Sequence, residues 1–125
     1  MTAGFESYVD GWWRRFREAE RQRKNRERKA RALVPKLAEH LVARFGARRV
    51  ILWGSLAAGR FGADSDIDLV VEGLPPGRAL FRALAESADL AGEFRVDLVP
   101  WEDASAALRA AAEREGIVVH DARSA

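Results

Sequence analysis

Two aspartates near the middle of the chain stand where carboxylates are unusual. Asp66 and Asp68 alternate with Ile67 and lead into the apolar run 69–71. In a strand, side chains alternate between the two faces, so both carboxylates project from one face, about 6–7 Å apart along the strand. Asp is depleted in strands, and two like charges on one face repel each other, so a purely structural role explains this pair poorly. Such a pair can share two metal ions, which in phosphoryl-transfer sites lie about 3.5–4 Å apart.

A glycine and a serine follow the preceding apolar run, residues 50–53, which is also typical of a strand. Gly54 allows a backbone to come close to a ligand. Ser55 adds a hydroxyl at a place where exposed N–H groups can receive phosphate. One end of the stretch from 53 to 71 therefore suits a triphosphate, and the other end suits its magnesium.

A third carboxylate is predicted beside the first two. Residues 94–99 alternate as a strand, and Asp97 lies on the face opposite Val96 and Leu98. If this strand neighbours the strand that carries Asp68 and the faces match, three carboxylates converge. Water and phosphate oxygens would complete the octahedral shells of two hard cations there. For the nearby Asp64 we expect only a capping or solubilising role.

These residues carry a family resemblance. Gly-Ser at 54–55, followed by Ser-Asp-Ile-Asp-Leu at 65–69, resembles the nucleotidyltransferase superfamily that includes DNA polymerase beta. The short chain and the wording Gly-Ser-x-Ala-x-Gly at 54–59 are similar to its minimal, MNT-type branch, many of whose members are antitoxins of HEPN-domain toxins. The resemblance covers residues from about 34 to 120 and leaves the first thirty or so outside it.

The resemblance implies a reaction and a set of roles. Asp66 and Asp68 would each bind two Mg²⁺ ions, and Asp97 would bind the ion that activates the acceptor hydroxyl. The hydroxyl would attack the α-phosphate of ATP in line, with pyrophosphate leaving. The residues implied in nucleotide binding are Gly54, Ser55, Arg60 and Ser65. Family members often carry an Arg where this chain has Ala58, and Arg60 would then supply the phosphate contact.

The resemblance leaves several functions open. The first is a protein adenylyltransferase of the EC 2.7.7 type that silences its cognate HEPN toxin by transferring AMP to a hydroxyl, expected to be that of a Tyr. The second is an antitoxin that acts by stoichiometric binding and occlusion through its N-terminal helix, with a degenerate catalytic site. The third is nucleotidyl transfer to RNA or a small molecule, which the lack of a substrate domain disfavours.

The alternation of strand and helix patterns predicts an α/β fold. Helices are expected over 34–45, 80–88 and 102–115, with strands at 50–53, 67–71, 94–99 and 117–119. The resemblance implies a small mixed β-sheet of the nucleotidyltransferase type. Pro35 indicates a break between an N-terminal helical arm, residues 1–33, and a nucleotidyltransferase domain, residues 34–125.

The N-terminal arm combines aromatic and basic residues. An aromatic stripe recurs at helical spacing, and residues 20–29 contain no apolar side chain. Ten basic and five acidic residues give the first 31 residues a net charge of +5, within a chain of +2. We expect the basic part to project into solvent and the stripe, Phe5, Tyr8, Val9, Trp12 and Phe16, to dock on a protein partner or a second copy, although packing on its own domain is an equal alternative. Nucleic-acid binding is less favoured because Glu residues interrupt the basic run.

Composition excludes several other classes. The chain has no Cys, which excludes a disulfide framework and a thiolate metal site. No apolar run approaches the roughly 20 residues of a membrane span, and no apolar segment typical of a signal peptide follows Met1. We therefore expect a cytoplasmic, single-domain protein.

Overall fold

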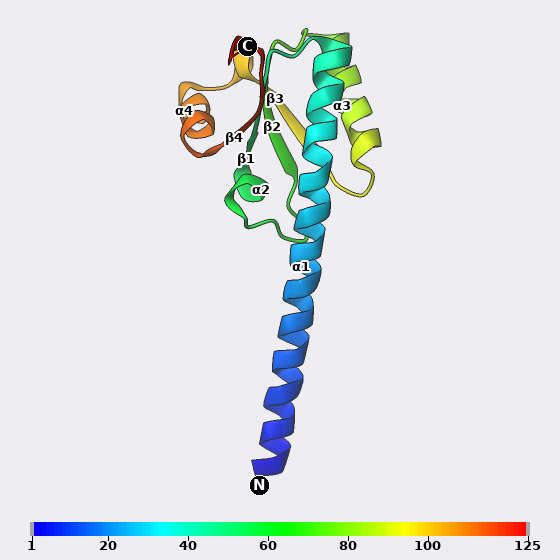
Figure 1. Ribbon diagram of the computed structural model, residues 1–125, viewed down its shortest axis with the longest axis vertical. Coiled ribbons are helices and arrows are strands. Elements are labelled where there is room, and N and C mark those ends of the chain that lie inside the picture. Colours follow the sequence, from blue (N-terminus) through cyan, green and yellow to red (C-terminus); the bar gives the residue numbers. More distant parts are fainter. Residues whose placement is uncertain (1, 125) are drawn as a thin grey trace.

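The computed structural model describes residues 2–124 and contains one four-stranded sheet with helices on both faces (Figure 1). The strands are β1 (Arg49–Trp53), β2 (Ile67–Glu72), β3 (Val96–Pro100) and β4 (Ile117–Asp121), in the spatial order β3-β2-β1-β4. β1 pairs antiparallel with β2 and β4, whereas β2 and β3 are parallel. The predicted mixed sheet is therefore confirmed.

The helices are α1 (Thr2–Phe45), α2 (Gly54–Ala58), α3 (Arg78–Ala91) and α4 (Ala106–Glu115). Two short 3₁₀ turns, η1 (Trp101–Asp103) and η2 (Ala122–Ser124), complete the described residues. α1 and α3 lie side by side against the sheet, and α4 lies at its opposite side (Figure 1). No helix among the described residues has the length and apolar character to cross a membrane.

Strand alternation divides the apolar residues between the two faces of the sheet. Leu52, Leu69 and Leu98 face α1 and α3 in the main core. Ile51, Val70 and Ala112 form a smaller cluster under α4. Because side chains alternate, the even-numbered residues of β2 share a face with this smaller cluster.

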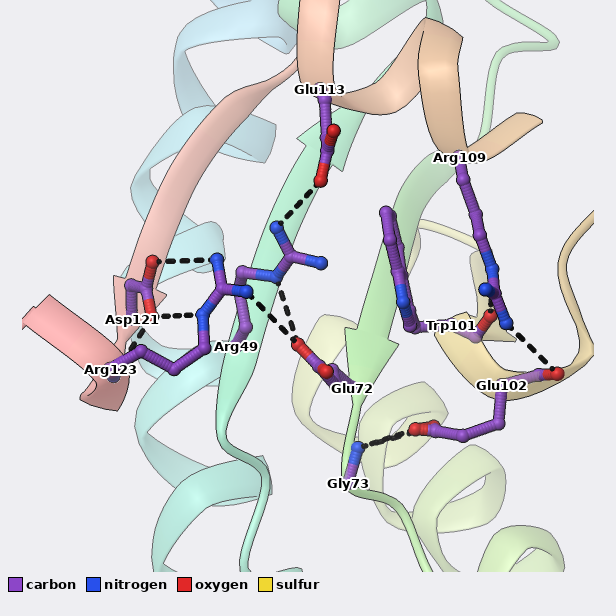
Figure 2. A network of polar contacts seen from close by, with 9 residues as sticks. All are labelled: Arg49, Glu72, Gly73, Trp101, Glu102, Arg109, Glu113, Asp121 and Arg123. Atoms are coloured by element: carbon purple, nitrogen blue, oxygen red, sulfur yellow. Dashed lines mark hydrogen bonds and ion pairs between the residues drawn. The ribbon is translucent and has the colours of Figure 1, made fainter. Parts of the chain in front are cut away.

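A buried arginine ties the α4 face together at one end of the sheet (Figure 2). The Arg49 side chain is 4% exposed and lies 3.1 Å from Glu72 and 3.2 Å from Glu113. Its guanidinium also lies 4.1 Å from the ring centroid of Trp101. Two carboxylates and an aromatic face thus compensate the desolvation of one cation. The network joins β1, β2, α4 and η1 at the end of the sheet where β1 begins.

The break predicted at Pro35 is wrong, because α1 continues through it. A proline inside a helix costs about 3 kcal/mol, so tertiary packing must compensate. Ala30, Val34, Leu37 and Leu41 are all buried against the domain, on one helix face and on both sides of Pro35. Pro35 itself is exposed, and so is Arg31, whose carbonyl loses its helical partner to the proline. The division into an arm and a domain at residue 33 stays a prediction.

The basic part of α1 does not project into solvent as expected. The Arg26 guanidinium lies 4.7 Å from the ring centroid of Phe94, and Arg31 donates a 2.8 Å hydrogen bond to the carbonyl of Leu56. The backbone N–H of Phe61 donates to Glu27 over 3.3 Å. Long arginine stems cover apolar surface while their charged groups find polar partners, so a run without apolar residues still packs on a core.

Two smaller expectations also differ from the structure. The helix expected from 102 begins at Ala106, because Ser105 accepts a hydrogen bond of 3.1 Å from the N–H of Leu108 and so caps it. The short helix α2 was not expected. It follows directly from Gly54, whose φ of 77° turns the chain out of β1.

These contacts predict where the chain can be shortened. Deleting residues 1–31 should lower the free energy of unfolding by at least about 2 kcal/mol, because the packing of Arg26 and Ala30 and the hydrogen bond of Arg31 are lost. Urea denaturation followed by circular dichroism measures this loss. Deleting only residues 1–20 is the matched control and should shift the midpoint much less than deleting residues 1–31 when both are measured at about 1 μM protein. Equal midpoints for both truncations would contradict this account of α1.

Candidate nucleotidyl-transfer site

The register between β2 and β3 places two of the three predicted aspartates side by side. Asp68 pairs directly with Asp97 across the parallel ladder, so both side chains lie on the same face of the sheet. This is the face of the smaller apolar cluster, to which Val70 and Val99 also belong. The predicted strand alternation around Asp97 is thus present in the fold.

The environment of Asp68 disfavours its charged form. Burial, followed by the negative charges of Asp97 and Asp66, raises the pKa of Asp68 to about 6. Asp68 therefore lies close enough to both Asp97 and Asp66 to be repelled by them. Repulsion of this kind is relieved by a proton or by a cation.

Asp66 lies just before β2 and is held by an arginine that the sequence did not single out. Arg95 Nε lies 2.8 Å from Asp66 Oδ1, yet without the angle of a hydrogen bond, so this buried oxygen accepts none. Arg95 also donates to the carbonyl of Asp64 over 3.0 Å. Arg95 stands two residues before Asp97, and strand alternation alone could have placed it on the same face.

Gly54 lies directly against Asp68. Gly54 has a φ of 77°, and a Cβ atom on it would lie 2.5 Å from Asp68 Oδ2. Trp53, the last residue of β1, pairs with Asp68 across the antiparallel ladder and so brings the two segments together. Any side chain at position 54 would displace the carboxylate, so glycine is required there both by conformation and by space.

A cleft of about 420 Å³ opens beside this contact. Three of the four residues predicted to bind nucleotide line it, together with the position where the family often has an arginine. The lining is formed by Trp53, Gly54, Ser55, Ala58, Arg60 and Glu115. Arg60 is exposed at the cleft, and within residues 2–124 its guanidinium forms no ion pair or hydrogen bond. Trp53 and Glu115 were not singled out from the sequence, which carries no signal for them.

Ser65, the fourth predicted nucleotide contact, lies outside the residues that line this cleft. Its hydroxyl accepts a 2.9 Å hydrogen bond from the N–H of Gly62, and its own N–H donates to the Gly62 carbonyl over 3.2 Å. Ser65 thus closes the turn that leads into Asp66. The hydroxyl proton remains available as a donor.

The three carboxylates are the type of ligand that a hard cation prefers, although their side chains are not arranged around a single ion position. Among the described residues, no three acidic or histidine side chains are close enough together to hold a metal ion as they stand. Arg95 already lies against Asp66. Carboxylates are nonetheless the oxygen ligands that Mg²⁺ prefers, and Asp68 is repelled by Asp97 and by Asp66, which has a buried oxygen that accepts no hydrogen bond.

The raised pKa of Asp68 makes a prediction for the protein in chelator. A raised pKa means that the folded state binds the proton more tightly than the unfolded state, so ionised Asp68 destabilises the fold above about pH 6. Asp68→Asn should therefore stabilise the protein at pH 8 by about 1–2 kcal/mol after allowance for solvent screening. The gain should shrink as the pH falls through 6 and be absent near pH 4. Thermal unfolding in EDTA across this range measures it, with Asp64→Asn as the control, and a destabilised variant at pH 8 would contradict the repulsion.

Comparisons with known proteins agree with this geometry. The sequence model of a family described as polymerase beta, nucleotidyltransferase matches residues 36–124. A solved structure assigned as a minimal nucleotidyltransferase is 35% identical, covers 66% of this chain and 86% of its own, and has a TM-score of 0.57. No curated protein matched the chain.

Two further solved structures share the fold at lower identity. One is a mutant of the toxin–antitoxin pair MntA–HpeT, 22% identical, with a TM-score of 0.62 over 71% of this chain and 73% of that one. The other is a toxin–antitoxin structure with AMP-PNP, also 22% identical, with a TM-score of 0.62 over 73% and 76% of the two chains.

Proposed function

The chain belongs to the polymerase beta nucleotidyltransferase family, as one of its minimal members, and we propose that it transfers AMP from ATP to a hydroxyl of a cognate HEPN-type toxin, thereby acting as an antitoxin. The observation that carries this proposal is the register that sets Asp68 beside Asp97, next to Asp66 and Gly54. A metal-dependent transfer of a nucleotide requires carboxylates gathered beside a cleft, and here a single arginine faces three of them.

Each residue of the site would have its own role in the reaction. Asp66 and Asp68 would hold two Mg²⁺ ions, and Asp97 would hold the one on the acceptor side. The metal ions supply charge neutralisation at the α-phosphate and at the leaving pyrophosphate. The acceptor oxygen forms a bond to the α-phosphorus while the bond from that phosphorus to the bridging oxygen breaks. Asp97 would help to take the hydroxyl proton, and Arg60 and the backbone around Gly54 and Ser55 would orient the triphosphate.

The toxin as acceptor is supported by what the related structures are. Two structures with this fold are toxin–antitoxin assemblies, and one of them was solved with AMP-PNP. We therefore propose ATP as the donor and a toxin side chain, a Tyr, as the acceptor. Incubation of the protein with each NTP, Mg²⁺ and the toxin encoded beside it, followed by intact mass measurement, tests this. A toxin that gains no nucleotide mass, while an RNA or a small molecule does, would overturn the assignment of the acceptor.

A second candidate function is neutralisation by binding alone. Ala58 favours it, because the cleft lacks the arginine that the family often carries at this position. Binding alone predicts that variants without the carboxylates still neutralise the toxin in stoichiometric amounts. Transfer predicts that they do not.

The first prediction for the reaction concerns the metal ligands. Asp66→Asn and Asp68→Asn should each lower the rate of AMP transfer at least about a hundredfold, because each removes a charge that holds the cations. Intact mass of the toxin at timed intervals gives the rate. Asp64→Asn, an exposed neighbour outside the cluster, is the control. A variant of Asp66 or Asp68 with near wild-type turnover would exclude the two-metal site.

Arg60 is expected to act on binding of the nucleotide. Arg60→Ala should raise the KM for ATP by about tenfold and change kcat less, as expected for a contact to ground-state phosphate. Steady-state transfer rates at varied ATP measure both constants. Arg78→Ala, an exposed arginine on α3 outside the cleft, is the matched control. An unchanged KM would remove Arg60 from the nucleotide site.

A further inference from the structure

The first half of α1 carries an aromatic surface that its own domain leaves uncovered. Five aromatic residues there are 46–70% exposed: Phe5, Tyr8, Trp12, Trp13 and Phe16. From here on, the aromatic stripe means these five residues, which include Trp13 and leave out Val9. The rings that touch do so within the stripe: Trp12 and Phe16 stack at 5.6 Å, and Trp13 meets both edge-on. Monomeric proteins rarely leave so large a contiguous apolar patch in water.

The stripe lies on the same side of α1 as the domain. Trp12 and Phe16 precede Ala30 and Val34 by about five whole helical turns, so the two pairs share one face. Ala30 and Val34 are buried against the domain, whereas the N-terminal half of α1, which carries the stripe, extends beyond the domain (Figure 1). The contacts of α1 with the loop after α2 begin at Arg23, which donates to the carbonyl of Phe61. The stripe therefore borders a free space on the domain side of α1.

We propose that this space is filled by the same segment of a second copy, so that the two aromatic stripes pair antiparallel in a homodimer. The distribution of charge along this segment of α1 indicates that a second copy fills the space and that the two helices run antiparallel. In the free segment, residues 2–19, the first half carries Glu6 and Asp10 and no basic residue, whereas the second half carries Arg14, Arg15 and Arg17 against the single Glu18. Antiparallel pairing lays the acidic half of each helix against the basic half of the other.

The positions of the charges around the helix favour the same direction. Glu6 and Arg17 are about three turns apart and flank the stripe on one side, whereas Arg15 flanks it on the other. In an antiparallel pair, the same flank of each helix meets the same flank of the other, so Arg17 of one copy lies on the flank that faces Glu6 of the other, about 3 Å from it along the helix axis. In a parallel pair, the flank of each helix that carries Arg17 would meet the flank of the other helix that carries Arg15. Arg17 of one copy would then lie against Arg15 of the other. Like charges in contact disfavour the parallel arrangement.

The length of the free segment also fits. Pairing Phe5 with Phe16 of the second copy centres the two-fold axis between Asp10 and Gly11. A second helix that begins at Thr2 then ends level with Ala19, short of Arg23 and the domain. The two domains would lie at opposite ends of the paired helices, without a clash.

The area is sufficient for a modest interface. Five aromatic side chains, each about half exposed, offer roughly 500 Å² per copy, or about 1,000 Å² in total, near the lower limit for a specific interface. We therefore expect dissociation in the micromolar range rather than an obligate dimer. The inference does not depend on the transfer reaction, because the mass of the protein alone tests it.

Sedimentation of the full chain from about 1 to 100 μM provides the first test. The wild-type protein should shift from monomer to dimer, and Trp12→Glu should weaken the association at least tenfold. Phe81→Glu is the matched control, since Phe81 is 75% exposed on α3, away from the stripe. A wild-type chain that stays monomeric to 100 μM, or a dimer that survives Trp12→Glu, would overturn the proposal. The first of these results, together with a toxin complex that Trp12→Glu abolishes, would assign the stripe to the toxin instead.

Paired charge reversals test the direction. Glu6→Arg alone and Arg17→Glu alone each place like charges opposite one another twice and should weaken the dimer several-fold. An equimolar mixture of the two variants restores two attractive pairs, so it should form a mixed dimer at least as stable as the wild type. Native mass spectrometry resolves the mixed species from each homodimer. A mixture that associates no better than either variant alone would overturn the antiparallel arrangement.

Discussion

Like charges held close together by strand register are the central constraint of this structure. Asp68 cannot move away from Asp97 without breaking the β2–β3 ladder, and it cannot move toward β1 because Gly54 is already in contact with it. The free energy that holds the carboxylates there comes from elsewhere in the sheet. Ile67, Leu69 and Leu98 bury their side chains against α1 and α3 and fix the register. The apolar face of each strand thus compensates the repulsion on the other face.

The two ends of the α4 face differ in how their charges are matched. At one end, Arg49 is buried between Glu72 and Glu113 and against Trp101, and the cation is fully paired (Figure 2). At the other end, three aspartates share a single contact to an arginine, from Arg95 to Asp66. A protein of this size can clearly build a compensated network, so the excess of negative charge at the aspartate end favours a site for a cationic ligand over a structural role.

The sequence predicted the elements that depend on strand alternation. The predictions failed where packing between segments far apart in the chain determines the structure. The strand bearing Asp97 follows from a local pattern of apolar residues, whereas the mixed sheet was implied by the family resemblance and not by residue spacing. The helix break at Pro35 was wrong because the burial of Val34 and Leu37, a tertiary effect, outweighs the local cost of proline. The pairing of Arg95 with Asp66 depends on which strands are neighbours, and residue spacing alone does not specify this.

Continuity of α1 through Pro35 has a mechanical consequence. A hinge at that residue would let the N-terminal half move freely, and a partner held there could reach the cleft in many orientations. Without a hinge, the contacts of Arg26, Ala30 and Arg31 fix the helix to α2 and to the loop that follows it. That loop leads through Ser65 into Asp66. Whatever covers the aromatic stripe is therefore held at a set position relative to the carboxylates, because one rigid helix bears the stripe and packs on the segment that carries Asp66.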